Sequence, residues 1–343
     1  MKKFFSGKAI LIIGGTGTIG KGLIKELIKQ NPSVIRIFSR DEYKQFEIQN
    51  HSDFVSDYKD FRFLIGDVRD YERVERAMEG IDIVFNLAAM KHVGSCEYNP
   101  TEAIKTNVDG MNNVIKAAIK HNIECVLFTS SDKAINPVNT YGATKMLAEK
   151  LVQAANYSKG KIQTKFIAVR FGNVMGSRGS VIPLFKKQIL EQKRITVTDP
   201  TMNRFMMSLS NAVNLMMKAC EVSIGGELFI LKMPVVNIGI MSEVIVEEVS
   251  KKYDIDKKMV KIDYIGSKAG EKYHEELMTV DESHYAKDLG DMIAVMPTSY
   301  NNDYYKNYYK EYDKCEFKSY SAEFIKDIEK QEVRNLIISE GIL

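Results

Sequence analysis

Short apolar runs alternate with longer amphipathic segments through the first half of the chain. The runs at 9–13, 34–38, 61–65, 83–87, 125–129 and 166–171 are rich in β-branched residues and predict strands. The segments 21–29, 71–78, 101–121 and 141–157 repeat apolar residues at helical spacing and predict helices. Because the strand runs are apolar on both faces, the pattern predicts a doubly wound parallel sheet with helices on each side, a Rossmann-type α/β fold.

The alternation loosens after residue 172, and this change suggests a second unit. Strands are expected at 195–197, 226–231 and 260–265, and helices at 209–221 and 241–253. We expect residues 1–172 to form a dinucleotide-binding domain that carries the catalytic residues. Residues 173–300 are expected to form a smaller α/β substrate lobe over the carboxyl ends of the strands, from which a strand or helix can return to the core.

Residues 301–343 form a tyrosine-rich C-terminal segment. The tyrosines between 300 and 312 repeat at three- and four-residue spacing. This spacing favours an amphipathic helix packed on the body or on a neighbour. A surface for stacking nucleic-acid bases is the alternative, but no basic groove accompanies the tyrosines.

Composition argues against several other classes of protein. The 343 residues are 45% hydrophobic, and 48 basic residues nearly balance 45 acidic ones, which argues against a nucleic-acid binder. The four cysteines are far apart and the five histidines lack ligand spacing, so neither a disulfide framework nor a metal site is expected. The longest apolar stretches are too short to span a bilayer, and the N-terminal apolar run reads as a strand. We therefore expect a cytoplasmic protein that does not interact with membranes.

A glycine-rich turn follows the first predicted strand and opens a predicted helix. Glycines at this turn allow the backbone to approach a pyrophosphate, which the free N–H groups of the helix N-terminus can bind. The pattern therefore predicts a nicotinamide dinucleotide site. The loop residues expected at the cofactor are Gly14, Thr16, Gly17, Thr18, Ile19 and Gly20.

The end of the second predicted strand indicates which cofactor is bound. Ser39 and Arg40, with Lys44 nearby, suit a 2′-phosphate, so NADP is expected. NAD is the alternative, because Asp41 could bind the ribose hydroxyls. After the third and fourth strands, further cofactor contacts are expected from Asp67, Val68, Ala88 and Ala89.

A tyrosine and a lysine stand four residues apart near the start of the predicted helix 141–157. Tyr141 and Lys145 would share one face of this helix, and a nearby ammonium favours the phenolate. Tyr141 could then take and return a hydroxyl proton, with Lys145 also contacting the cofactor. Three other Tyr–Lys pairs share the spacing, but only this one follows a strand that ends near Ser131, which can bind the substrate oxygen.

Together these motifs resemble the extended short-chain dehydrogenase/reductase superfamily. From residue 6 to about residue 298 the chain is similar to nucleotide-sugar dehydratases, specifically the UDP-N-acetylglucosamine 4,6-dehydratases (inverting) of the pseudaminic-acid pathway. Some related dehydratases have methionine at the position of Tyr141, so the tyrosine points to the pseudaminic branch. The matching stretches are Ser39-Arg40-Asp41-Glu42, Ala88-Ala89-Met90-Lys91-His92-Val93, Ser131-Asp132-Lys133-Ala134, Arg170-Phe171-Gly172-Asn173-Val174 and Gly176-Ser177-Arg178-Gly179-Ser180.

The resemblance implies an NADP-dependent dehydration of UDP-N-acetylglucosamine at C4 and C6 with inversion at C5. A ketone formed at C4 acidifies the C5 proton, a base removes it, and an acid protonates the departing C6 hydroxyl. The resemblance implies Asp132 as this acid and Lys133 as the base, with Lys133 reprotonating C5 from the opposite face. Crowding by Lys145 and partial desolvation would lower the pKa of Lys133. The alternative is that Asp132 caps the following turn and Lys133 is solvated.

Polar and cationic residues beyond the reactive group are candidates to bind the UDP-sugar. Arg204 resembles the family's phosphate-binding arginine, and residues 270–272 match its GEK motif near the uridine. Lys268 stands where the family has an arginine, so it keeps the charge but loses the bidentate geometry. The expected substrate contacts are Lys91, Asn173, Arg178, Arg204, Lys268 and Glu271.

Alternatives to this assignment remain open at the level of the sequence. A retaining 4,6-dehydratase or a UDP-sugar 4-epimerase would use the same fold. A non-catalytic NADP-sensing protein is an alternative of another class, although the presence of Tyr141 and Lys145 argues against it. Pairing of the helices 101–121 and 141–157 with symmetry mates would give a homo-oligomer.

Overall fold

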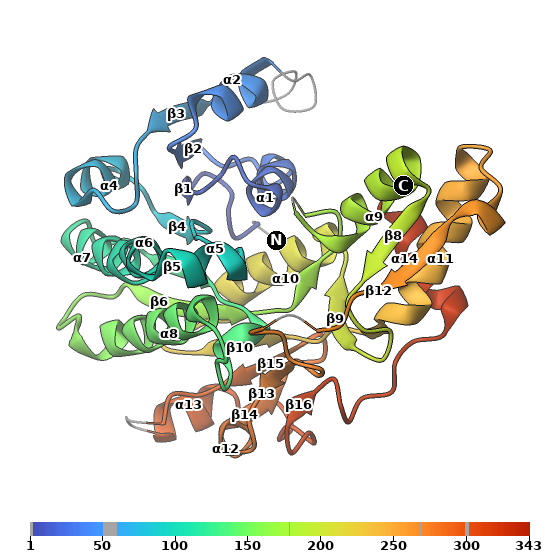
Figure 1. The fold of residues 1–343 in the computed structure, drawn as a ribbon. Coiled ribbons are helices and arrows are strands. Elements are labelled where there is room, and N and C mark those ends of the chain that lie inside the picture. Colours follow the sequence, from blue (N-terminus) through green and yellow to red (C-terminus); the bar gives the residue numbers. More distant parts are fainter. Residues whose placement is uncertain (1–2, 51–59, 178, 268, 299–301) are drawn as a thin grey trace.

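The computed structural model describes residues 3–50, 60–177, 179–267, 269–298 and 302–343. A nine-stranded sheet forms its centre, in the order β14-β15-β10-β6-β5-β4-β1-β2-β3 (Figure 1). Neighbouring strands from β10 to β3 run parallel, while β15 is antiparallel to both β10 and β14. The strands of this sheet are β1 Ala9–Ile13, β2 Val34–Ser39, β3 Phe61–Ile65, β4 Ile83–Asn86, β5 Cys125–Thr129, β6 Lys165–Arg170, β10 Leu228–Leu231, β14 Ala286–Asp288 and β15 Met292–Val295.

Helices cover both faces of the sheet, which confirms the predicted doubly wound α/β fold. On one face α4 packs on α7 and α7 packs on α8, and on the other face α1 packs on α10 (Figure 1). The buried side chains of the strands are mostly Ile, Val, Leu and Phe, as expected for strands covered on both sides. The helices of this part are α1 Thr18–Ile28, α2 Glu42–Asn50, α4 Tyr71–Met78, α5 Val93–Tyr98, α6 Pro100–Ile104, α7 Gly110–Lys120, α8 Thr140–Ser158, α10 Leu209–Val222 and α12 Val280–Ser283.

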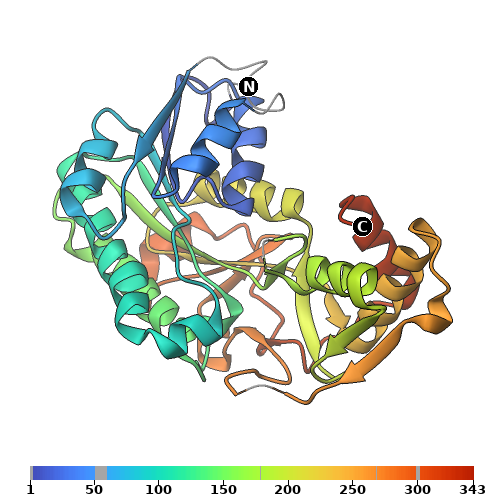
Figure 2. The ribbon, with the colours of Figure 1, turned by 45° about the horizontal axis from the view of Figure 1, so that its top comes forward.

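A smaller lobe lies beside the sheet and has its own apolar core (Figure 2). Helices α9, α11 and α14 pack there with a parallel pair formed by β8 and β12 and a sheet of order β11-β9-β7. Its elements are β7 Asn173–Val174, α9 Val181–Gln192, β8 Arg194–Val197, β9 Asn203–Met207, β11 Val235–Asn237, α11 Ile238–Lys252, β12 Lys261–Tyr264 and α14 Lys330–Ser339. A further antiparallel pair joins β13 Glu276–Met278 to β16 Tyr320–Ser321.

Two predictions about the elements need correction. The segment predicted as one helix at 101–121 begins at Pro100 and contains a π-helical turn, Lys105–Asp109, between α6 and α7. Apolar periodicity predicts a continuous helix there, because the one extra residue of a π-helical turn hardly changes the pattern of apolar positions. The pattern also gave no prediction for α2, α9 and α14.

The strand expected at 226–231 is β10, and it belongs to the central sheet. It pairs in parallel with β6, and the antiparallel β15 follows it. The chain therefore enters the lobe after β6, returns to the sheet with α10 and β10, enters the lobe again, and returns once more with β14 and β15. Among the described helices, none has both the length and the apolar character that a bilayer crossing requires.

The tyrosine-rich segment packs on the body of the protein through α13, Asn302–Tyr308, as predicted for an amphipathic helix. Tyr305 and Tyr309 are buried, whereas Tyr304 and Tyr308 are exposed. The Tyr305 hydroxyl donates to the Gly225 carbonyl oxygen at 2.6 Å, and the Tyr309 hydroxyl donates to Glu227 Oε1 at 2.9 Å. The segment thus packs against the loop that precedes β10; Tyr300 lies outside the described residues.

Candidate active site

The glycine-rich turn has the close backbone approaches that a dinucleotide loop requires. Gly14 has φ +80°, and a Cβ there would lie 2.8 Å from the Ala88 nitrogen. A Cβ on Gly20 would lie 2.3 Å from the Gly15 carbonyl oxygen, so helix α1 can approach β1 only with glycine there. Gly17 is the N-cap of α1, no side chain caps it, and the first turn carries no acidic residue. The turn and the helix N-terminus therefore fit a bound pyrophosphate.

The residues expected near the adenosine end lie together at the carboxyl ends of β2 and β3. The Thr16 hydroxyl donates to the buried Ser39 hydroxyl at 3.1 Å, and Lys44 forms an ion pair with Asp41. The exposed Arg40 reaches Asp67 at 3.4 Å.

A second arginine, Arg69, also binds Asp67 at 2.7 Å. Burial alone would raise the pKa of Asp67, but the bonds from Arg69 and the charges of Arg40 and Arg69 lower it. Val68, the next residue, is buried, and its carbonyl oxygen accepts a bond from Asn113.

The loop after β4 is held by a residue that the sequence analysis missed. The buried Asn107 accepts the Met90 N–H at 2.9 Å and donates to the Met90 carbonyl oxygen at 3.0 Å and to Thr144 at 2.9 Å. It lies in the π-helical turn, a feature frequent at functional sites. Asn107 thereby ties the loop that carries Ala88 and Ala89 to α8. An asparagine inside a predicted helix was the signal that could have identified it.

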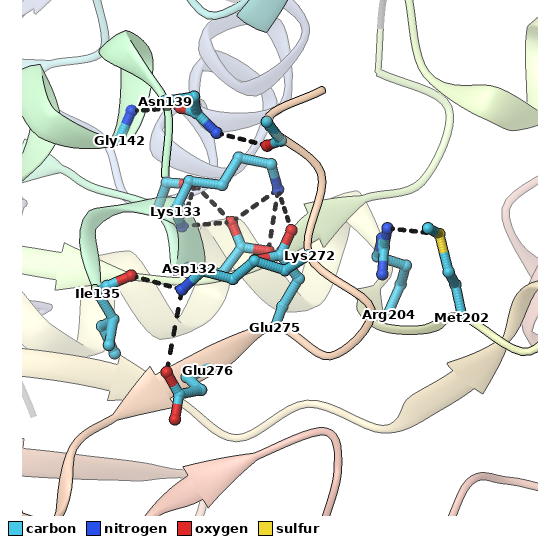
Figure 3. A network of polar contacts seen from close by, with 12 residues as sticks. Asp132, Lys133, Ile135, Asn139, Gly142, Met202, Arg204, Lys272, Glu275 and Glu276 are labelled. Atoms are coloured by element: carbon cyan, nitrogen blue, oxygen red, sulfur yellow. Dashed lines mark hydrogen bonds and ion pairs between the residues drawn. The ribbon is translucent and has the colours of Figure 1, made fainter. Parts of the chain in front are cut away.

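The turn after β5 carries a buried ion-pair cluster. Lys133 Nζ lies 3.2 Å from Asp132 Oδ1 and 3.0 Å from Glu275 Oε1, so the ammonium stands between two carboxylates (Figure 3). Asp132 Oδ1 also accepts the Ser131 hydroxyl at 2.6 Å and the Lys133 N–H at 2.9 Å. The side chains of Asp132 and Glu275 are 2% and 3% exposed, and that of Lys133 is 23% exposed. Lys133 is therefore not a solvated residue.

The pKa of Lys133 differs from the sequence-based expectation. Burial alone would lower it, but the charges of Asp132 and Glu275 outweigh burial and raise the pKa above its usual range. The expected lowering by Lys145 is wrong, because the two carboxylates dominate the surroundings of this ammonium. In the resting protein Lys133 is a cation.

Contacts with two parts of the chain hold this turn in place. A Cβ on Gly142 would lie 2.0 Å from the Lys133 carbonyl oxygen, so only glycine lets the turn pack on the first turn of α8. Asn139 caps α8 by accepting the Gly142 N–H at 2.8 Å and donates to the Gly270 carbonyl oxygen at 2.9 Å (Figure 3). Lys272 Nζ donates to the Ile135 carbonyl oxygen at 2.7 Å. Residues 270–276 therefore pack along the turn.

Tyr141 and Lys145 both lie buried on α8. Burial raises the pKa of Tyr141 to about 12, and the Ser131 hydroxyl and the charge of Lys133 oppose this rise. Lys145 Nζ donates to the Thr129 carbonyl oxygen at 2.7 Å, and burial lowers the pKa of Lys145 to about 7, with Glu149 opposing. The expected low pKa of Tyr141 is wrong, because burial outweighs the charge of Lys133.

A cavity of about 230 Å³ in the lobe brings together two of the expected substrate residues, Asn173 and Arg204. Arg204 Nη1 donates to the carbonyl oxygens of Asn203 and Tyr273, and its charge also acts on Lys133 and Glu275. Arg204 therefore lines the cavity and also acts electrostatically on the ion-pair cluster.

Of the other expected substrate residues, two do not line this cavity and two lie outside the described residues. Lys91 is exposed after β4, and Glu271 is half-buried in the 270–276 segment. Arg178 and Lys268 lie outside the described residues. In the described part of the chain, no group of three His, Cys, Asp or Glu side chains could hold a metal ion.

Comparisons with known proteins place these features in a family. Residues 10–297 match the family described as polysaccharide biosynthesis protein. The chain is 43% identical over 296 residues to a UDP-N-acetylglucosamine 4,6-dehydratase (inverting) of Campylobacter jejuni, covering 86% of this chain and 84% of that protein. It is 41% identical over 295 residues to a UDP-glucose 4-epimerase of Rickettsia canadensis, covering 85% of this chain and 83% of that protein. It is 46% identical over 331 residues to the uncharacterized membrane protein MJ1061 of Methanocaldococcus jannaschii, covering 96% of this chain and 98% of that protein.

Solved structures agree with the fold. The X-ray structure of Pen from Bacillus thuringiensis has a TM-score of 0.92 and 50% identity, covering 99% of both chains. DesIV, a dTDP-glucose 4,6-dehydratase from Streptomyces venezuelae with NAD and TYD bound, has a TM-score of 0.67 at 16% identity. The match covers 77% of this chain and 86% of the DesIV chain. At 16% identity the likeness concerns the fold alone.

Replacing Gly142 with alanine tests the contact between the turn and α8. The added Cβ meets the Lys133 carbonyl group, so we expect G142A to lower the free energy of unfolding by about 1–3 kcal/mol. G94A is the matched control in α5, because nothing lies within 4 Å of a Cβ there. Urea unfolding measures both variants. Equal stability of G142A and G94A would contradict the close approach.

Proposed function

Because the chain belongs to the polysaccharide biosynthesis protein family of nucleotide-sugar dehydratases and epimerases, we propose that it is an NADP-dependent UDP-N-acetylglucosamine 4,6-dehydratase that inverts C5. The product would be UDP-2-acetamido-2,6-dideoxy-β-L-arabino-hex-4-ulose, and the reaction would be the first step of pseudaminic-acid biosynthesis. The observation that carries the proposal is the buried pair of Asp132 and Lys133 beside Ser131 and Tyr141. A dehydration needs an acid and a base in addition to the tyrosine, and this pair supplies both.

The bound nicotinamide supplies a reversible hydride acceptor for oxidation at C4 and reduction at C6. Tyr141 takes the proton of the C4 hydroxyl. Because Ser131 acts on the phenol and the Ser131 hydroxyl donates to Asp132 at 2.6 Å, the proton could pass through Ser131 to Asp132. Asp132 then gives that proton to the leaving C6 hydroxyl. Lys133 takes the C5 proton and, after its N–H hydrogens exchange with solvent, gives a proton to the opposite face of C5. The C4 proton thus leaves in the water molecule.

The surrounding residues support a nucleotide sugar and NADP as ligands. In the lobe cavity, Arg204 would hold the diphosphate and Asn173 would contact the substrate. Lys91, Arg178, Lys268 and Glu271 remain proposed substrate contacts. At the adenosine end Arg40 is exposed and Lys44 is close, which supports a 2′-phosphate. NAD remains the alternative cofactor, since Asp41 is also there and the fold relative DesIV binds NAD.

Two related reactions and an assembly belong to the same proposal. The Rickettsia relatives named UDP-glucose 4-epimerase favour epimerisation as the second candidate, and a retaining dehydratase would share the acid and base. A protein that only senses NADP would not need the buried Asp132–Lys133 pair.

We also propose a homo-oligomer, because the helices expected to pair expose the apolar side chains of Ile104 and Leu147.

Incubation with UDP-N-acetylglucosamine in deuterated water, followed by NMR, tests the proposed reaction. We expect a 4-keto-6-deoxy sugar with the L-arabino configuration and deuterium at C5. D132N removes the acid and K133M removes the base. Each change should slow product formation about 10²- to 10⁴-fold. An intact C6 hydroxymethyl group with inverted C4 would identify an epimerase instead. Retained C5 configuration would identify a retaining dehydratase, and absence of any reaction would contradict an enzyme for this substrate.

Calorimetric titration of cofactor-stripped protein tests the cofactor assignment. R40A removes a charge-assisted contact to the 2′-phosphate, so we expect its Kd for NADP to rise about 10- to 100-fold while its Kd for NAD is unchanged. R62A, a change of another exposed arginine on the neighbouring strand β3, is the matched control and should leave both constants unchanged. Tighter binding of NAD than of NADP by the unchanged protein would contradict the assignment.

A further inference from the structure

Glu275 is a buried carboxylate that no sequence motif singled out. It precedes β13, far from Lys133 along the chain, and 2% of the whole residue is exposed. Its Oε1 lies 3.0 Å from Lys133 Nζ, slightly closer than either oxygen of Asp132. Its main chain is fixed, because the Glu275 carbonyl oxygen accepts the Ala322 N–H at 2.9 Å. The carboxylate is therefore held against the amine that the proposed reaction uses as its base.

The two oxygens of Glu275 have different surroundings. Oε1 bonds Lys133, whereas Oε2 is buried and has no hydrogen-bond partner within the described parts of the chain. A buried carboxylate oxygen without a donor disfavours the ionised form. Burial and the charge of Asp132 raise the pKa of Glu275, while the charges of Lys133 and Arg204 oppose the shift. Glu275 is thus the member of the cluster best suited to hold a proton.

The proposed reaction leaves a proton to be accounted for. Lys133 is a cation in the resting protein and cannot remove the C5 proton until it loses one of its own. Asp132 cannot take that proton, because it receives the C4 proton through Tyr141 and Ser131. Asp132 Oδ1 also accepts bonds from the Ser131 hydroxyl at 2.6 Å and from the Lys133 N–H at 2.9 Å.

We propose, on the basis of the proposed function, that Glu275 accepts a proton from the Lys133 ammonium and so frees the amine that removes the C5 proton. An N–H bond of Lys133 breaks and an O–H bond forms on Glu275. The amine then takes the C5 proton, exchanges its hydrogens with solvent, and later gives a proton to the opposite face of C5. The proton on Glu275 moves back to Lys133, and Asp132, Lys133 and Glu275 end the cycle as they began it. Glu275 acts through Lys133 and is a positioning residue.

Solvent deuterium exchange at C5 with E275Q tests this role. The amide keeps the shape of the side chain but cannot accept the proton, so we expect C5 exchange and product formation to fall about 100-fold or more near neutral pH. The loss should shrink as pH rises, since hydroxide can then take the Lys133 proton and the missing Glu275 charge lowers the pKa of Lys133. E275D, which keeps a carboxylate, should exchange faster than E275Q.

E276Q is the matched control, because Glu276 bonds Asn136 at 3.1 Å and its side chain is 29% exposed. It should exchange C5 at the unchanged rate. Calorimetry with the nucleotide sugar and thermal unfolding show whether E275Q still binds and folds; if it does not, E275D carries the comparison with wild type. The inference is overturned if the carboxamide variant exchanges C5 like wild type, if its loss is the same at every pH, or if E275D is no faster. A wild-type protein that forms no product overturns the proposed function and this inference together.

Discussion

An ammonium group held between two buried carboxylates is the interaction on which the site depends. Lys133 contacts Asp132 and Glu275 within 3.0–3.3 Å, and both acids are almost fully buried. Burying charges costs several kcal/mol for each ion unless partners and hydrogen bonds compensate. Asp132 has such donors in Ser131 and in the Lys133 N–H, but Glu275 Oε2 has none within the described residues. The hydrogen bonds of the cluster therefore compensate the cost of burying its charges only in part.

The fold brings the members of this cluster together from distant parts of the chain. β5 delivers Ser131, Asp132 and Lys133 to the carboxyl edge of the sheet, where glycine at 142 lets the turn pack on α8. The 270–276 segment then crosses this edge and contacts both the turn and β9 of the lobe, since the Tyr273 carbonyl oxygen accepts bonds from Asn203 and Arg204. A shift of the lobe would therefore act on the proton-transfer groups and on the cavity at the same time.

Much of this arrangement could be predicted from the sequence, and the failures have physical causes. The strands at 9–13 and 125–129 were predicted with their observed limits, because buried parallel strands are continuous apolar runs. The limits of the edge strand at 61–65 were also predicted correctly, although it is only partly buried. Ser131, Tyr141 and Lys145 were predicted as site residues from local motifs, and Asp132 and Lys133 from the family resemblance. The structure joins Ser131, Asp132 and Lys133 by a hydrogen bond and an ion pair, buries Tyr141 on α8, and bonds Lys145 to the Thr129 carbonyl oxygen. Glu275 and Asn107 were missed because their roles depend on contacts between segments distant in sequence. The directions of the Lys133 and Tyr141 pKa shifts were also missed, since they depend on burial and on a carboxylate that the motif does not contain.

A crystal structure with UDP-N-acetylglucosamine and the nicotinamide cofactor bound tests the central claim most directly. The account predicts that the hexose lies beside the turn after β5, with Lys133 Nζ directed at C5, Asp132 directed at the C6 hydroxyl, and Glu275 still bonded to Lys133 on the side away from the sugar. A hexose whose C5 and C6 face away from Asp132 and Lys133 would contradict the account.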